Sequence, residues 1–129
     1  GVEHDERLRE LLAPDSLAGW AVLLLVVLPI VAGVEEFIFR AAIIGAMAAG
    51  FGVSPWLLAM LSSAAFALGH GAQGPAGIVV TGSLGLVLAA AFVLSGSLLL
   101  VVVAHYVVNA LEFLVHEGLG VDPFSRAAD

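Results

Sequence analysis

The sequence predicts an all-α fold, a polytopic bundle of about four to five transmembrane helices. Of its 129 residues, 61% are hydrophobic and only 12% are charged. The stretch from Ala41 to Leu111 contains no Asp, Glu, Lys or Arg. It also lacks any sustained alternation of apolar and polar residues, which is the pattern typical of a strand. Because backbone in lipid must satisfy its hydrogen bonds internally, apolar sequence of this length favours helices.

The chain divides into a polar N-terminal lead-in at 1–16, an apolar core at 17–117 and a polar tail at 118–129. Most of its net charge of −7 lies in the two flanks, and it contains no Lys and no Cys. An acidic, lysine-free exterior argues against nucleic acid as a partner, and the absence of Cys excludes disulfides and thiolate chemistry. We expect the lipid bilayer to be the partner, and the apolar composition predicts an integral, multi-pass protein of the cell membrane.

The first apolar run, 17–34, has spanning length, and helix-compatible sequence continues to about Ala49. Pro29 and Gly33 predict a kink or a break within it. Residues 50–55 are typical of a turn, with Ser54 as a helix N-cap and Pro55 in the first helical position.

Three further helices complete the prediction. The next helix is expected over about 55–68, followed by a loop or unwound segment at 69–77 that contains four glycines. Helices are then expected over about 78–94 and 98–115, separated by a break at Ser95-Gly96-Ser97.

The few ionisable groups in or beside the apolar region mark a candidate site, since such groups are expensive in a bilayer and are kept mainly for function. Glu36 and Arg40 stand four residues apart on one helix face and are predicted to pair. Glu35 lies about 100° away around the same helix, so it can face a different neighbour. The alternative is an interfacial charge cluster that ends one helix.

Two histidines and an asparagine extend this candidate site. His70 follows a glycine at a predicted helix end, and His105 and Asn109 lie four apart on the last helix. Glu35, His70 and His105 are evenly spaced along the chain, with about one span and a turn between neighbours. We therefore predict that these three side chains and Asn109 converge around one polar cavity.

The residues leave several chemistries open. In one, Glu35 and His70 polarise a water for hydrolysis while His105 and Asn109 donate hydrogen bonds to an oxyanion. A second is a metal site with His and Glu ligands, although no compact HExxH helix is present and the ligands would come from three distant segments. A third is an ion pathway, which should show interrupted helices in two similar halves that this sequence lacks.

Three motifs together resemble those of a known family. They are Glu35-Glu36-x-x-x-Arg40, Phe66-x-x-x-His70 and His105-x-x-x-Asn109, in this order. They resemble the CPBP (Abi) intramembrane proteases, the type II CAAX prenyl endopeptidase group that includes the Ras-converting enzyme. The resemblance covers about Trp20 to Glu117. Family members commonly have further transmembrane helices before the first motif, where this chain offers at most one span.

The resemblance implies an all-helical, glutamate-dependent endopeptidase. In this interpretation Glu35 is the base that activates water, His70 holds the same water, and His105 and Asn109 form the oxyanion hole. Glu36 and Arg40 would support the site, with no metal and no other cofactor. The implied substrate is a peptide or protein, either prenylated or membrane-embedded. The alternatives are a zinc-dependent intramembrane metalloprotease and a non-catalytic bacteriocin-immunity or scaffold protein of the same family.

Overall fold

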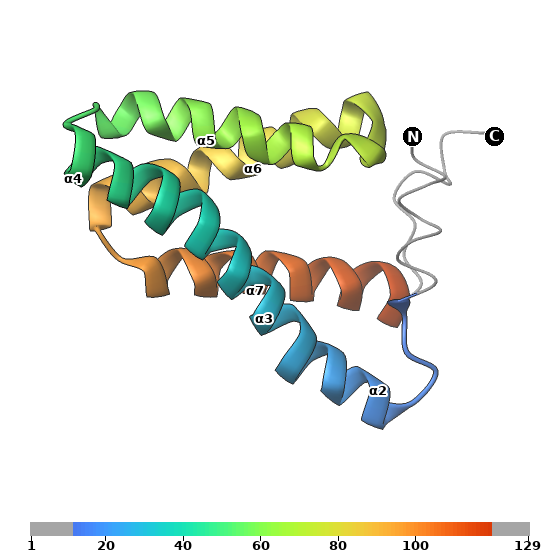
Figure 1. Cartoon of the computed structure of the whole chain (residues 1–129). Coiled ribbons are helices and arrows are strands. Elements are labelled where there is room, and N and C mark those ends of the chain that lie inside the picture. Colours follow the sequence, from blue (N-terminus) through green and yellow to red (C-terminus); the bar gives the residue numbers. More distant parts are fainter. Residues whose placement is uncertain (1–11, 120–129) are drawn as a thin grey trace.

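The computed structural model describes residues 12–119, and within this range the chain is helical and contains no strand (Figure 1). The predicted all-α fold is therefore confirmed. Most of the predicted polar segments 1–16 and 118–129 lies outside the described residues.

The first part of the chain is one uninterrupted helical stretch, which we call the long helix. It consists of α2 (Leu17–Val22), η1 (Leu23–Val27), α3 (Leu28–Glu36), η2 (Phe37–Ala46) and α4 (Met47–Phe51). The segments η1 and η2 are π-helical. The remaining elements are α5 (Pro55–Gly69), the 3₁₀ turn η3 (Gly71–Gln73), α6 (Gly74–Ser95), α7 (Leu98–Phe113) and the π-helical η4 (Leu114–Gly118).

No break occurs at Pro29 or Gly33, where the sequence predicted a kink or a break. Pro29 has no N–H to donate, which would interrupt the hydrogen bonds of an ideal α-helix. Immediately before it, however, η1 widens the helix, and the Leu28 N–H donates to the Leu23 carbonyl five residues back. This π-helical turn accommodates the proline and keeps the long helix continuous.

The helix ends follow from local sequence. Gly52 and Gly96 end α4 and α6 with φ of 65°, a left-handed conformation that favours glycine. The Ser97 hydroxyl accepts the Leu100 N–H and caps α7. The unwound segment predicted at 69–77 is shorter than expected, because α6 already begins at Gly74.

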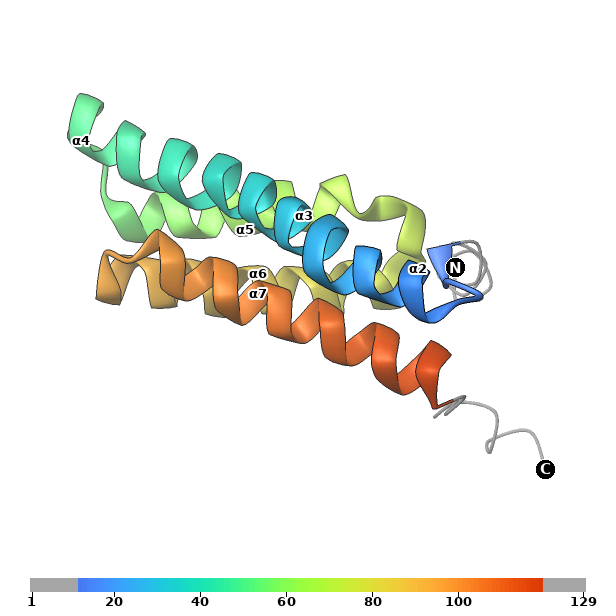
Figure 2. The ribbon, with the colours of Figure 1, turned by 90° about the horizontal axis from the view of Figure 1, so that it is seen from below.

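The long helix crosses the antiparallel pair α5 and α6, and α7 lies beside α3 (Figures 1 and 2). Two apolar clusters hold this arrangement together. One joins η2, α5 and α6 through Ile44, Leu58, Ala59 and Ala89. The other joins η1, α3 and α7 through Leu23, Leu28 and Ala110. Between the two clusters lies the region where α3, the end of α5 and α7 approach one another.

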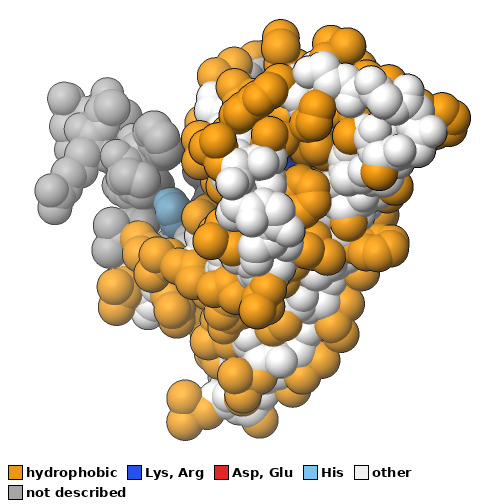
Figure 3. All heavy atoms as spheres, turned by 90° about the vertical axis from the view of Figure 1, so that its left-hand side faces the viewer, with side chains coloured by type: hydrophobic (Ala, Val, Ile, Leu, Met, Phe, Trp, Pro, Cys, Tyr) orange, Lys and Arg blue, Asp and Glu red, His pale blue; other side chains and the backbone are white. Residues whose placement is uncertain are grey.

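Within the described residues, three helical stretches are long and apolar enough to cross a membrane: 17–51, 71–95 and 98–118. The fourth, α5, is apolar but shorter. The face of the molecule at the α4 end is covered mainly by hydrophobic side chains (Figure 3). Large apolar side chains are also exposed along every long stretch, as expected where lipid rather than water is the solvent.

Candidate active site

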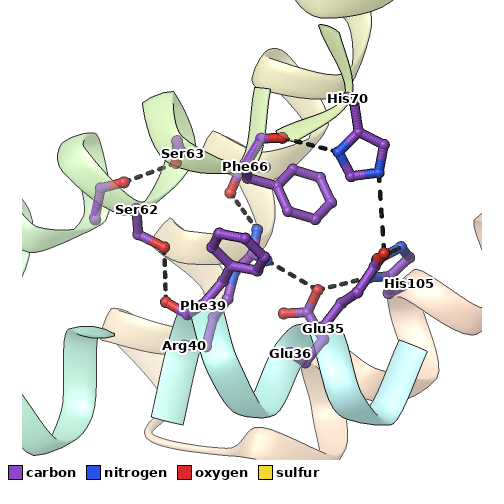
Figure 4. A network of polar contacts seen from close by, with 11 residues as sticks. Glu35, Glu36, Phe39, Arg40, Ser62, Ser63, Phe66, His70 and His105 are labelled. Carbon is purple, nitrogen blue, oxygen red and sulfur yellow. Dashed lines mark hydrogen bonds and ion pairs between the residues drawn. The ribbon is translucent and has the colours of Figure 1, made fainter. Parts of the chain in front are cut away.

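A buried ion pair anchors the site on the long helix. The Arg40 Nη1 donates to Glu36 Oε1 at 3.0 Å, and both side chains are completely buried (Figure 4). The pair predicted from the four-residue spacing is therefore present. Its burial shows that it is not an interfacial charge cluster facing water.

The same guanidinium reaches two other helices. Its Nη2 donates to the carbonyl of Gly85 on α6 at 2.7 Å. Its carbon lies 5.0 Å from the centre of the Phe66 ring of α5, within the range of a cation–π contact. Arg40 thus connects the long helix to both members of the α5–α6 pair.

His105 links this ion pair to the neighbouring carboxylate. Its Nδ1 lies 2.6 Å from Glu36 Oε1, and its Nε2 lies 3.4 Å from Glu35 Oε2. Consecutive helical positions point the two glutamates in different directions, so the imidazole of α7 meets Glu36 on one side and Glu35 on the other. Because an ionised carboxylate only accepts hydrogen bonds, the short contact assigns a proton to Nδ1 of His105.

His70 reaches Glu35 from the end of α5. Its Nδ1 donates to the carbonyl of Phe66 at 2.8 Å, since a carbonyl oxygen only accepts. In a neutral imidazole this leaves the Nε2 lone pair free, and Nε2 lies 3.9 Å from Glu35 Oε1 (Figure 4). The helix end therefore orients His70, because the last turn of α5 supplies the carbonyl that holds its ring.

Exposure separates these side chains into two groups. The side chains of Glu35 and His70 are 26% and 28% exposed, whereas that of His105 is only 4% exposed. Glu36 and Arg40 lie beneath them with no exposure. Glu35 and His70 thus form an accessible rim, and the buried Glu36–Arg40 ion pair lies below it.

Asn109 lies one turn beyond His105 on α7 and is half-buried. Within residues 12–119 it makes no hydrogen bond to Glu35, His70 or His105. The structure therefore places both His70 and His105 next to Glu35, while Asn109 shares only the helix of His105.

Other residues of the site were not predicted. The Phe66 ring packs against Phe39, His70 and His105, with ring centres 5.0, 4.5 and 5.9 Å away. Ser62, fully buried, donates to the carbonyl of Phe39 at 2.6 Å. Phe66 belongs to one of the three motifs, but the motif alone indicated no role for it. Nothing in the sequence distinguishes Ser62 or Gly85 from the other small residues of these helices.

The buried part of the network is energetically costly. Within the described residues, Glu36 Oε2 and Arg40 Nε have no hydrogen-bond partner. Leaving a buried polar atom unpaired costs about 1–3 kcal/mol, and more for a charged group. A charged cluster kept at this cost inside an apolar bundle indicates function rather than stability.

Carboxylates and imidazoles, the side chains of this site, are also typical metal ligands. Among the described residues, no group of three His, Cys, Asp or Glu side chains is placed so that it could hold a metal ion. His105 Nδ1 and His70 Nδ1 are engaged by Glu36 and by the Phe66 carbonyl. These contacts leave the Nε2 atoms of both histidines facing Glu35.

Comparison with protein-family models gives a match to "Type II CAAX prenyl endopeptidase Rce1-like" over residues 17–111. This range includes Glu35, Glu36, Arg40, His70, His105 and Asn109. Neither the curated proteins nor the solved structures contain a match. The matched range covers most of the chain and includes all three motifs. The chain therefore belongs to the Rce1-like family of type II CAAX prenyl endopeptidases, an integral membrane family with intramembrane protease-like function.

Proposed function

We propose that this protein is a glutamic intramembrane endopeptidase in which Glu35 is the general base. One observation carries the proposal. The Glu35 carboxylate lies between the Nε2 atoms of His70 and His105, at the accessible rim of an otherwise buried network. A base must be reachable by water and substrate, and Glu35 is the partly exposed carboxylate of this network.

His70 is suited to hold the attacking water. Its separation of 3.9 Å from Glu35 Oε1 is too long for a direct hydrogen bond, and Nδ1 is already engaged. A water between the two groups donates one hydrogen to Glu35 and the other to His70 Nε2. Glu35 takes the first proton as the water oxygen bonds to the scissile carbonyl carbon, and it returns that proton to the amine leaving group as the C–N bond breaks.

His105 is suited to stabilise the oxyanion. With Nδ1 donating to Glu36, its Nε2 donates only when the ring carries a second proton. The carboxylates of Glu35 and Glu36 flank the ring, and Arg40 pairs with Glu36. Asn109 is the second proposed donor, because it lies one helical turn beyond His105 on the same face of α7.

The zinc-dependent alternative predicts the opposite response to metal removal. We expect the purified protein to cleave a quenched-fluorescence peptide with a farnesylated CAAX terminus at the same rate before and after treatment with EDTA or phenanthroline. The reason is that neither water activation by Glu35 nor donation by His105 uses a cation. The unprenylated peptide serves as a second substrate and shows whether the lipid group is recognised. Loss of cleavage with chelator, restored by Zn²⁺, would establish the metalloprotease instead.

Replacing Asn109 with Ala should lower kcat by about 10²–10³, the usual loss for one oxyanion-hole donor. KM should change little, because the oxyanion exists only in the transition state. The matched control is Val108→Ala on the same turn of α7, an exposed apolar position expected to keep wild-type kcat. Steady-state kinetics with the farnesylated peptide measures both. An Asn109→Ala enzyme with unchanged kcat would remove Asn109 from the oxyanion hole.

A further inference from the structure

We infer that Gly85, which belongs to none of the three motifs, is a positioning residue for the site. Its missing side chain lets α6 approach closely enough for the Gly85 carbonyl to hold Arg40 and for Phe66 to pack beneath both histidines. Only the kinetic part of its test rests on the proposed function.

The first observation is the hydrogen bond between Arg40 Nη2 and the Gly85 carbonyl, 2.7 Å long and buried. Two side-chain hydrogen bonds hold this guanidinium among the described residues, one to Glu36 and one to Gly85. The hydrogen bond to the α6 backbone therefore holds Arg40 in the position from which it pairs with Glu36.

The second observation is the space around the glycine. A Cβ at position 85 would lie 3.0 Å from Phe66 Cδ1 and 3.7 Å from Arg40 Nη2. The first distance is shorter than ordinary van der Waals contact, so either the ring or α6 must move. Phe66 contacts Arg40, His70 and His105, and displacing its ring therefore disturbs each of them.

These contacts form a chain from Gly85 to the proposed base. The carbonyl of Gly85 holds Arg40, Arg40 holds Glu36, Glu36 holds Nδ1 of His105, and His105 faces Glu35. A small shift at Gly85 thus reaches the reacting groups without any contact between Gly85 and substrate. Misplacement of catalytic groups by about 1 Å can cost on the order of 10²-fold in rate.

Gly82 offers a matched control one turn earlier on α6. A Cβ at Gly82 would lie 3.1 Å from the Cβ of Ala67 on α5. Gly82→Ala therefore introduces a similar steric clash at the same α5–α6 interface. Gly82, however, has no hydrogen bond to Arg40 and no contact with Phe66 within this distance. A general packing defect should appear in both variants, and a positioning defect only in Gly85→Ala.

The test combines a spectroscopic and a kinetic measurement on Gly85→Ala and Gly82→Ala. We expect the ¹⁵N signal of His105, assigned by comparison with His105→Gln, to shift in Gly85→Ala as the contact with Glu36 changes. We also expect kcat for the farnesylated peptide to fall by on the order of 10²-fold with KM nearly unchanged. Gly82→Ala should resemble wild type in both measurements.

The Gly85→Ala/Phe66→Leu variant lacks the ring atom that the new Cβ meets. Its His105 signal should therefore match that of Phe66→Leu alone, and this comparison also decides the case in which Gly85→Ala does not fold. Identical behaviour of Gly85→Ala and Gly82→Ala, or different His105 signals in the double variant and Phe66→Leu, would overturn the inference. If wild type leaves the peptide uncut, the proposed function fails while the His105 signal still decides the role of Gly85.

Discussion

Glu35→Gln should abolish peptide hydrolysis while leaving substrate binding intact. Glutamine keeps the size and most of the polarity of the side chain, but it cannot accept the proton of the attacking water. Loss of a general base typically costs 10²–10⁴-fold in rate. Because the substituted atoms touch the water and not the body of the substrate, the Kd of a labelled farnesylated peptide should change little.

The control is Glu117→Gln, which removes a carboxylate in η4 outside the site network. Cleavage and fluorescence anisotropy would be measured on wild type and both variants in the same detergent. Wild-type cleavage by Glu35→Gln would refute the glutamate mechanism. A wild type that binds the peptide but never cleaves it would instead favour the non-catalytic immunity or scaffold role within the family.

Arg40→Met should destabilise the protein by about 3–5 kcal/mol, the usual effect of leaving one member of a buried ion pair uncompensated. Glu36 would then remain as a fully buried carboxylate without its guanidinium. The double variant Glu36→Leu/Arg40→Met should recover much of this stability, since apolar side chains of similar volume often replace a buried pair at little cost. Reversible unfolding in detergent micelles measures all three proteins.

The same double variant should be inactive although it is folded, because His105 loses the carboxylate that holds its Nδ1. A double variant that is stable but inactive would show that the Glu36–Arg40 pair serves the active site rather than the stability of the fold. An Arg40→Met protein as stable as wild type would show that the pair contributes nothing to folding. An active double variant would show that Glu36 does not orient His105.

Local sequence was sufficient to predict most of the helix boundaries. Pro55 begins α5, Gly96 ends α6 and Ser97 caps α7, each for a reason contained in the residue itself. The continuity of the long helix was not predictable in this way. Whether Pro29 breaks a helix depends on whether the preceding turn can widen, which the residue types alone do not specify. In the structure η1 and α7 share an apolar cluster that includes Leu23 and Ala110.

The same distinction applies to the candidate site: contacts within one helix could be predicted from the sequence, whereas contacts between helices could not. Residue spacing along one helix sets which side chains share a face, so the Glu36–Arg40 pair was predictable from four positions of sequence. The rarity of ionisable side chains in this apolar sequence likewise singled out Glu35, His70 and His105 as candidate site residues, and the motif resemblance implied their roles. The rotation and depth of separate helices are set by packing between them, which no single segment encodes. Helix packing therefore governs which nitrogen of His105 faces Glu36, and it alone brings the bare backbone of Gly85 against Arg40.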